Sequence, residues 1–407
     1  MTDARLERIY NVAEMRRRAR RWLPKMIFEF VDGGAEDERT VRWNEDGFTQ
    51  IRLVPRSLEG AARPDLSTEI FGQKLAMPLM IGPTGMAGMI WPQGEIEAAK
   101  AAHAAGTAWC MSHGTTCSIE EVVAATKGPL WLQTYIYQDR GWTEHFAARA
   151  KAAGYRALVL TIDNQWLGQR ERDIRNGFVV PPQPKLSNVI DVFRSLPWLA
   201  RHGFSLDRIR FANYAELAKD TGLLRLGARM GGMLDPAMSW KDVAWLRRLW
   251  DGPLVLKGVL HPDEASRAID HGIDGIIVSN HGGRQLDGAP AAIEALPWIA
   301  DVAKGRTRIM LDGGLRRGGD VVRALALGAD LCLIGRPQLW GLAVAGQAGV
   351  ARILEIFRAE MDRVMGLCGF ATIGAIDRTA LALPSGWPKL CEVRGVQPAA
   401  APGLAAE

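Results

Sequence analysis

A histidine and an arginine lie three residues apart in the segment SNHGGRQLD, which covers residues 279–287. A histidine can accept a proton near neutral pH, and an arginine binds a carboxylate through two hydrogen bonds. His281 directly follows an apolar run, so we expect its ring at the end of a buried strand, with Arg284 facing the same pocket. The pair predicts proton removal from an anionic substrate. A purely structural histidine is the alternative.

Two other ionisable residues end apolar runs in the same way. Asp163 is a candidate partner for His281, because a carboxylate beside an imidazole favours the protonated ring. A helix cap is the alternative role for this carboxylate. Lys257 could form a Schiff base, or it could remain a cation that stabilises a developing anion. The residue types alone leave both of these roles open.

Glycine-rich turns that carry arginines follow the last two apolar runs. Residues 312–320 read DGGLRRGGD, and Gly335 and Arg336 end the next run. Barrel folds bind phosphate at such turns through backbone N–H groups and a helix N-terminus, and Arg316 and Arg336 would add charge-assisted hydrogen bonds. The triphosphate loop G-x-x-x-x-G-K-S/T and the dinucleotide loop G-x-G-x-x-G do not occur, so neither ligand is supported.

Eight short apolar runs must position these residues, and segments of helical character separate most of them. Strands alternating with helices predict a parallel sheet covered by helices, and eight units predict an α/β fold of the (β/α)8 TIM-barrel type. Such a barrel places its chemistry at the C-terminal ends of the strands. The eight runs are Leu79–Gly85, Ala108–Gly114, Leu130–Ile136, Ala157–Asp163, Leu254–Val259, Gly275–Asn280, Arg308–Gly314 and Leu331–Arg336.

We expect one domain over residues 1–380, with the barrel at about 76–350 and an N-terminal extension packed on it. This extension is expected to be helical over residues 4–22 and irregular from there to about residue 75. A tail over residues 381–407 is expected to be partly disordered, above all its Ala- and Pro-rich end at 397–407. The gap after the fourth run requires an insertion at about residues 180–235.

The centre of that insertion is basic and amphipathic. Residues 185–230 contain eight Lys and Arg against four acids, and apolar residues recur at helical spacing over 188–200, where Pro197 interrupts the pattern. Two interpretations stay open. The insertion is either a lid over the barrel mouth or an element that contacts an anionic membrane surface.

The composition of the 407 residues is that of an ordinary globular protein, with 48% apolar and 23% charged residues. Lys and Arg total 50 against 45 Asp and Glu, a surplus too small to argue for nucleic acid. The five cysteines form no C-x-x-C pair and no secretory signal opens the chain, which favours the cytoplasm, with the inner membrane face as a peripheral alternative. No metal site is expected, because Cys110, His113 and Cys117 match no zinc spacing.

Several long motifs in order give the chain a family resemblance. SNHGGRQLDG, LDGGLRRGGDVVRALALGAD, IGRP, LPKMIFEFVDGGAED and GQRERDIRNGF resemble the FMN-dependent L-2-hydroxy acid oxidases and dehydrogenases. Glycolate oxidase, L-lactate dehydrogenase and (S)-mandelate dehydrogenase belong to that family. The resemblance runs from about residue 5 to 380 and implies a (β/α)8 barrel, an FMN cofactor, oxidation of an L-2-hydroxy acid to the 2-oxo acid, and a homotetramer.

The resemblance also implies residue roles. His281 would be the catalytic base and Asp163 its partner, and Lys257 would lie beside the N1/O2 edge of the flavin, where it stabilises the reduced form rather than a Schiff base. Contacts to the substrate carboxylate or hydroxyl would come from Arg284, Arg170 and Tyr135. The flavin ring would be held by Pro83, Thr84, Gly85, Ser112, Gln133, Thr161 and Ser279, and the ribityl phosphate by Asp312, Gly314, Arg316, Gly335 and Arg336.

Two positions depart from the family pattern and bear on the substrate. Phe30 stands where the family usually has a tyrosine that binds the substrate carboxylate. One hydrogen-bond donor is therefore lost, at a cost on the order of 1 kcal/mol of binding free energy unless another group, such as His113, replaces it.

Gly114 lies where glycolate oxidase has a bulky tryptophan. Together with the segment MPLMIGPTGMAGMIWPQG, this favours a large or aromatic substrate like mandelate, while SWKDVAWLRRLWDGP resembles lactate dehydrogenase and keeps lactate as an alternative.

The electron acceptor is suggested by a third position. Gly85 is typical of members that pass electrons to a quinone or another carrier, whereas members that react readily with oxygen tend to have alanine there. A dehydrogenase is therefore favoured, and an oxidase that produces hydrogen peroxide is the alternative.

Overall fold

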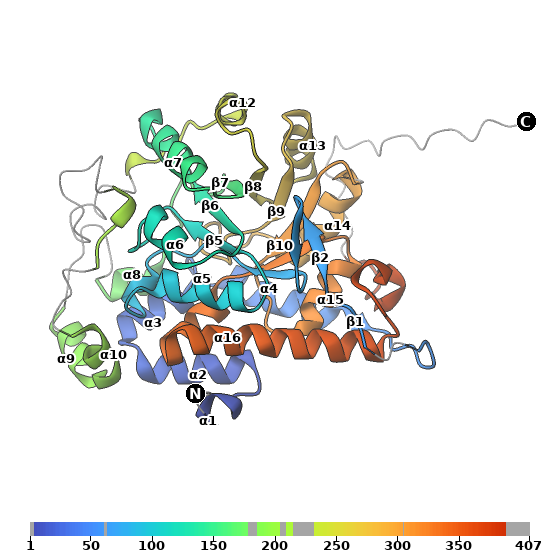
Figure 1. Cartoon of the computed structure of the whole chain (residues 1–407), viewed down its shortest axis with the longest axis horizontal. Helices are drawn as coiled ribbons and strands as arrows, with labels where there is room; N and C mark the ends of the chain where they lie inside the picture. Colours follow the sequence, from blue (N-terminus) through green and yellow to red (C-terminus); the bar gives the residue numbers. More distant parts are fainter. Residues whose placement is uncertain are drawn as a thin grey trace, which may run out of the picture.

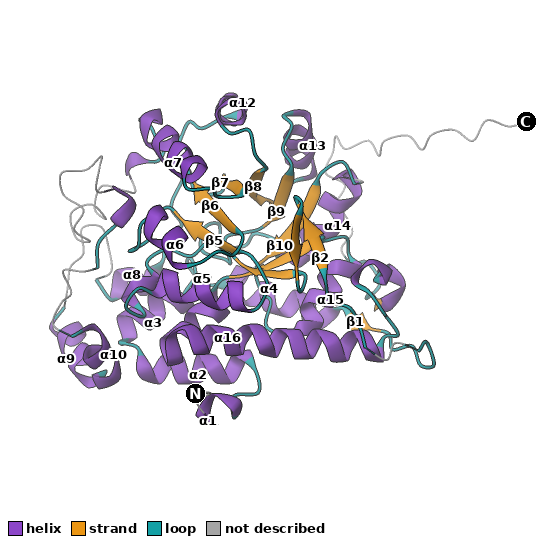
Figure 2. Cartoon of the chain, in the orientation of Figure 1, coloured by secondary structure: helices purple, strands orange, loops and turns teal. Residues whose placement is uncertain are grey.

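Eight parallel strands close into a barrel at the centre of the chain (Figures 1 and 2). The computed structural model describes residues 4–60, 63–177, 185–203, 209–214, 232–303 and 305–387. Each of the eight predicted apolar runs contributes one strand, so the predicted (β/α)8 barrel is confirmed. The strands are β4 (Leu79–Ile81), β5 (Trp109–Ser112), β6 (Leu130–Thr134), β7 (Ala157–Thr161), β8 (Leu254–Val259), β9 (Gly275–Val278), β10 (Arg308–Asp312) and β11 (Leu331–Ile334).

Alternation along the strands divides the apolar side chains between two cores. Met80, Cys110 and Met310 point into the barrel, whereas their neighbours along each strand pack under the outer helices. The hairpin of β2 (Thr68–Ile70) and β3 (Gln73–Leu75) adds Ile70 and Leu75 to the inner core. The hairpin therefore covers the N-terminal end of the barrel, at the opposite end from the C-terminal strand ends.

Helices cover the outside of the barrel (Figure 2). The sequence has helical character between strands at residues 95–105, 143–153, 262–271 and 319–327, and each of these segments forms a helix that begins within three residues of its expected start. The helix expected at 143 begins earlier, at Arg140, because Asp139 caps it by accepting from the backbone N–H of Gly141. The helices are α5 (Gly94–Ala104), α6 (Ile119–Ala125), α7 (Arg140–Ala152), α12 (Trp240–Leu249), α13 (Pro262–Asp270), α14 (Ala292–Ala303), α15 (Gly318–Ala326) and α16 (Arg336–Leu367).

The N-terminal extension packs on the barrel, as expected, through α1 (Ala4–Glu7), α2 (Val12–Trp22), α3 (Lys25–Asp32) and α4 (Arg39–Gln50). The predicted helical character of residues 4–22 is confirmed, although two helices form it. Asn11 starts the second helix by accepting from the N–H of Glu14, which breaks the chain between them. The prediction of irregular structure after residue 22 was wrong, because α3 and α4 follow there. Val12 and Met15 are buried, and α2 lies along α16.

The insertion forms α9 (Leu186–Arg194), α10 (Leu196–His202) and the short turn η3 (Ala212–Tyr214) after α8 (Glu171–Arg175). Pro197 lies in the first turn of α10, so the predicted interruption of the helical pattern is confirmed. Figure 1 places α9 and α10 at one end of the molecule, beside α3 and α2. Residues 178–184, 204–208 and 215–231, and residues 388–407 of the predicted disordered tail, lie outside the described residues. The first part of that tail is described, and β12 (Leu381–Ala382) pairs there with β1 (Arg52–Leu53).

Helix α16 bends sharply at Ala345 and Gly346, which have non-helical backbone angles. It has the length and hydropathy of a membrane-spanning helix, but 67% of its most apolar window is buried, as in the core helix of a globular domain. The two halves pack on each other through Gly341 and Gly349. A β-carbon on Gly349 would overlap the carbonyl of Gly341.

Gly349→Ala should therefore destabilise the protein by about 1–3 kcal/mol, because the backbone of α16 cannot move away from the added methyl group. Urea unfolding followed by circular dichroism measures the change. Gly366→Ala is the matched control in the same helix, where a β-carbon meets nothing within 4 Å. That control should be neutral or stabilising by up to about 1 kcal/mol, and equal behaviour of the two variants would refute the packing argument.

Candidate functional site

A cavity of about 540 Å³ opens at the C-terminal ends of the barrel strands. Most of the predicted site residues line it: Phe30, Pro83, Thr84, Gly85, Ser112, Gly114, Tyr135, Arg170, Lys257, His281, Arg284, Asp312, Gly314, Arg316, Gly335 and Arg336. Four others, Gln133, Thr161, Asp163 and Ser279, lie outside the lining. Three of these four hydrogen-bond to a residue in the lining, and Thr161 is buried at the end of β7.

The imidazole of His281 is held by a single carboxylate. Its Nδ1 lies 2.8 Å from Oδ1 of Asp163, which leaves Nε2 available to the cavity. His281 adopts a left-handed backbone (φ 57°), and this unusual turn re-aims the ring after β9. Burial lowers the pKa of His281 below its usual value, although Asp163 opposes that shift. The ring is therefore neutral near pH 7 and can accept a proton.

Asp163 stays ionised beside that ring. Burial alone would raise its pKa, but the neighbouring His281 and Lys257 charges outweigh burial and lower it. Its second oxygen, Oδ2, is buried and has no hydrogen-bond partner within the described part of the chain. This carboxylate can therefore orient His281 and stabilise the imidazolium that proton transfer would create.

Lys257 projects from β8 as a buried cation. Its Nζ donates to Oγ of Ser279 at 2.9 Å and lies 3.1 Å from Oδ2 of Asp312. Burial lowers its pKa, but the charges of Asp312 and Asp163 outweigh burial and raise it. A Schiff base needs the neutral amine, so this environment favours the role of a fixed cation. Ser279 also accepts from the backbone N–H of His281 at 3.0 Å, which ties the lysine to the histidine loop.

Three arginines, Arg170, Arg284 and Arg336, are partly buried around the cavity, and none of them forms an ion pair with a carboxylate within the part of the chain that the structure describes. Arg284 donates to the carbonyl oxygens of Phe30 at 2.8 Å and Gly33 at 3.1 Å. Burial, Arg170 and Arg336 lower the pKa of Arg284 well below its usual value. Burial also lowers the pKa of Arg170, and it lowers that of Arg336 to about 10. Carbonyl dipoles do not cancel these charges, so the cavity favours an anionic ligand.

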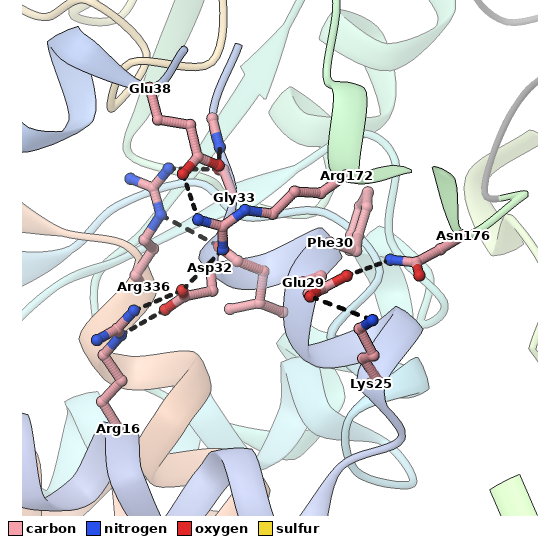
Figure 3. A network of polar contacts seen from close by, with 12 residues as sticks. Arg16, Lys25, Glu29, Phe30, Asp32, Gly33, Glu38, Arg172, Asn176 and Arg336 are labelled. Carbon is pink, nitrogen blue, oxygen red and sulfur yellow. Dashed lines mark hydrogen bonds and ion pairs between the residues drawn. The ribbon is translucent and has the colours of Figure 1, made fainter. Parts of the chain in front are cut away.

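The N-terminal extension forms one wall of this cavity, and a polar network fixes it there (Figure 3). Arg16 of α2 binds both oxygens of Asp32 at 2.6 Å, and Arg172 of α8 bridges Asp32 and Glu38. Arg336 donates to the carbonyl of Gly33 at 2.8 Å. Segments far apart in sequence thus hold α3 against the barrel, which positions the ring and the carbonyl of Phe30 beside Arg284.

The end of the cavity near β10 and β11 suits a phosphate with a hydroxylated chain. Arg316 and the first turn of α16, with Arg336, lie in the lining, and a helix N-terminus favours phosphate. Oδ1 of Asp312 is buried without a hydrogen-bond partner among the described residues, so it can accept from a hydroxyl group. These donors and acceptors fit the phosphate and ribityl chain of FMN, and Lys257 fits its ring.

Several residues that line the cavity were not found from the sequence. Met26, Leu167 and Leu234 add apolar side chains to the lining, together with Phe211 of the insertion. Asp173 directly follows the last Arg of GQRER and is buried in the lining, where burial raises its pKa. Met26 and Asp173 stand inside motifs already recognised, whereas no spacing rule points to Phe211 or Leu234.

His113 remains the candidate replacement for the missing tyrosine hydroxyl at Phe30. Its ring lines the cavity, and Nδ1 lies 3.3 Å from Oε1 of Gln133. Burial lowers the pKa of His113 to about 4, so the ring is neutral near pH 7. It can offer one N–H to a ligand or to Gln133, but it brings no charge to the site.

Comparisons with known proteins agree with these features. A family model described as FMN-dependent dehydrogenase matches residues 19–383. The chain is 40% identical to 2-hydroxyacid oxidase 1 of Homo sapiens, over 92% of this chain and 96% of that protein. It is 44% identical to an L-lactate dehydrogenase of Ectopseudomonas mendocina, over 89% of this chain and 96% of that protein.

Solved structures of the same fold are similar as well. A monotopic membrane (S)-mandelate dehydrogenase superposes with a TM-score of 0.87 at 37% identity, covering 92% of this chain and 99% of that one. A mandelate oxidase variant with (S)-mandelic acid has a TM-score of 0.78 at 35% identity, covering 92% and 98%.

Asp163→Asn tests the paired imidazole. We expect kcat to fall by about 100-fold or more, because the amide cannot stabilise the imidazolium. Turnover of the wild type should rise with pH as His281 loses its proton, with an inflection below the usual histidine pKa. Removing the negative charge of Asp163 should move that inflection to still lower pH.

The measurement is a pH profile of kcat/KM, with retention of the flavin spectrum as a check on folding. Asp251→Asn is the control, because this carboxylate pairs with Lys151 on the surface, at 2.8 Å. An Asp163→Asn enzyme with full activity and an unmoved inflection would show that the two groups do not act together.

Proposed function

The chain belongs to the FMN-dependent dehydrogenase family and oxidises a 2-hydroxy acid with FMN, and on that premise we propose that it prefers substrates with a large or aromatic side chain. The observation that carries this proposal is the apolar part of the cavity lining. Gly114 lines the cavity without a side chain, and Met26, Phe30 and Leu234 contribute apolar side chains to it. An apolar wall of this kind favours an aromatic ring over a methyl group.

Each residue of the cavity has a role in this reaction. Arg170 and Arg284 bind the substrate carboxylate, which supplies the negative charge that their buried guanidinium groups lack. His281 accepts the proton that the substrate loses, and Asp163 stabilises the resulting imidazolium. FMN, when bound, supplies the two-electron acceptor. Tyr135 faces the same space and can donate to the substrate, since burial raises its pKa and keeps the phenol protonated.

The remaining predicted residues hold the cofactor. Lys257 would balance negative charge at the flavin ring, and Asp312, Arg316 and Arg336 would bind the ribityl chain and phosphate. Gln133 and Ser112, hydrogen-bonded to each other at 3.2 Å, present polar atoms along the same edge. The turn Pro83-Thr84-Gly85, which lines the cavity, would also hold the flavin ring.

A substrate panel tests the side-chain preference. Under anaerobic conditions (S)-mandelate should bleach the flavin absorbance with a higher kcat/KM than L-lactate does. Phe30→Tyr should increase kcat/KM for small hydroxy acids, because the added hydroxyl supplies a further donor to the carboxylate. A strong preference of the wild type for lactate would refute the size argument and favour the lactate dehydrogenase alternative.

The acceptor is proposed to be a quinone or another electron carrier rather than oxygen. Gly85 supports this choice, and a β-carbon there would lie 3.0 Å from the carbonyl oxygen of Gly114, so the turn has little room for alanine. The similarity to 2-hydroxyacid oxidase 1 keeps the oxidase alternative open. Release of hydrogen peroxide in air at the rate of substrate loss would establish the oxidase.

The predicted homotetramer is tested separately, by measuring the mass of the same preparation with light scattering.

Peripheral membrane contact through the insertion is the second part of the proposal. Leu186, Val189, Ile190 and Phe193 lie on one face of α9, and their exposed fractions range from 45% to 77%. The next helix begins with Leu196, which is 66% exposed. An apolar face exposed to this extent on an amphipathic helix is typical of an element that lies in a lipid interface. The similarity to a monotopic membrane (S)-mandelate dehydrogenase supports the same view.

Vesicle sedimentation tests this contact. The wild type should sediment with vesicles that contain anionic lipid, and Phe193→Glu should abolish most of that binding without loss of activity towards soluble dyes. Leu58→Glu is the control, because Leu58 is fully exposed in a different part of the chain. Equal sedimentation of all three proteins would contradict the assignment to α9, and the insertion would then be a lid only.

A further inference from the structure

The short segment of the insertion over residues 211–214 is buried, unlike α9. Its turn η3 covers Ala212–Tyr214, and Asn213 and Tyr214 are fully buried. The backbone N–H of Ala212 donates to the carbonyl of Thr115 at 3.1 Å, one residue after Gly114. This segment therefore lies against the loop that follows β5, at the cavity.

Asn213 fastens the segment to that loop. Its Nδ2 donates to the carbonyl of His113 at 3.2 Å and to Oγ1 of Thr115 at 2.9 Å. Its Oδ1 accepts from the backbone N–H of Ile119 at 2.9 Å and from Arg149 at 3.4 Å. Both ends of a buried amide are thus paired, so only one orientation of Asn213 satisfies them all.

Tyr214 fixes the other side of the turn. Its hydroxyl lies 2.6 Å from that of Tyr137, whose ring lines the cavity. The ring of Tyr214 packs edge-on against Phe146 at 5.2 Å and lies 5.1 Å from the ring of Trp142. With the turn held at Asn213 and Tyr214, the preceding residue has little freedom. Phe211 is 5% exposed and lines the cavity with Gly114 and Leu234.

We propose that Phe211 is a specificity-determining residue whose ring packs against the substrate side chain in the space left by Gly114, and that Asn213 is the positioning residue that holds it there. This inference rests on the proposed function, and it adds which residue contacts the side chain of the substrate. The alternative is that Phe211 only fills the core of the insertion. The two differ in one respect, because a wall residue changes discrimination between substrates and a core residue changes only stability.

Phe211 and the groups that bind and deprotonate the substrate come from different segments of the chain. His281, Arg170 and Lys257 come from strand ends and the loops directly after them, whereas Phe211 comes from the insertion. A substitution at Phe211 can therefore alter the pocket without moving the proton acceptor or the carboxylate site. Its effect should appear in KM and in the dissociation constant of the 2-oxo acid product more than in kcat.

The experiment compares Phe211→Ala and Phe211→Leu with the wild-type holoenzyme on (S)-mandelate and L-lactate. We expect the mandelate-to-lactate ratio of kcat/KM to fall at least about tenfold in Phe211→Ala, because one face of the aromatic ring loses its contact. Phe211→Leu, which keeps an apolar wall, should fall in between. Benzoylformate should bind more weakly to Phe211→Ala in an anaerobic titration of the flavin spectrum, a readout that needs no turnover.

Phe193→Ala is the matched control, since it removes an exposed ring from the same insertion. Its mandelate-to-lactate ratio should equal that of the wild type. A ratio that stays within about threefold of the wild type in Phe211→Ala, or that rises, overturns the proposal. The failure of the wild type to oxidise any 2-hydroxy acid would overturn the proposed function instead, so the two failures are distinct.

Asn213→Ala tests the positioning role. It should lower the ratio in the same direction as Phe211→Ala and also lower the melting temperature, because buried partners of the amide are left unpaired. In the double variant Phe211→Ala/Asn213→Ala the ratio should fall no further than in Phe211→Ala alone. A folded Asn213→Ala enzyme with the wild-type ratio would show that Asn213 stabilises the fold without positioning the wall.

Discussion

The buried positive charge at the mouth of the barrel is the constraint on which the site depends. Within the described residues, Arg170, Arg284 and Arg336 are held by backbone carbonyls rather than by carboxylates in contact, so burial destabilises their charged forms. Folding tolerates this arrangement because the surrounding structure fixes each guanidinium in place. In the proposed function, anionic groups of a substrate and a cofactor would offset this cost, so recognition of both would have the same electrostatic cause.

That field also explains the behaviour of the proton acceptor. Burial is the main cause of the lowered pKa of His281, the charges of Lys257 and Arg170 lower it further, and Asp163 limits how far it falls. A neutral ring with an ionised partner is the state in which an imidazole can take up a proton and be stabilised afterwards. Burial also lowers the pKa of Lys257, but Asp312 and Asp163 together raise it, so Asp163 acts on both His281 and Lys257.

Sequence patterns predicted the barrel and the strand-end residues for a physical reason. In a closed parallel barrel the last residue of every strand reaches the same rim, so Asp163, Lys257 and His281 could be grouped without knowing any contact. The break before α2 was missed because one side-chain cap at Asn11 decided it. Phe211 and the carbonyl of Phe30 could not be found, because their places depend on packing between segments distant in sequence.

The insertion combines opposite surfaces within a few residues. The apolar face of α9 is exposed, whereas α10 is anchored to the rest of the protein through Arg201. The guanidinium of Arg201 donates to the carbonyls of Ala343 and Val344, and it lies over the rings of Trp22 and Trp91. Those carbonyls end the first half of α16, the helix that begins at Arg336 in the cavity. A cation at its C-terminal end stabilises that helix. The element that would touch a membrane is therefore fixed, through one short helix, to the phosphate end of the site.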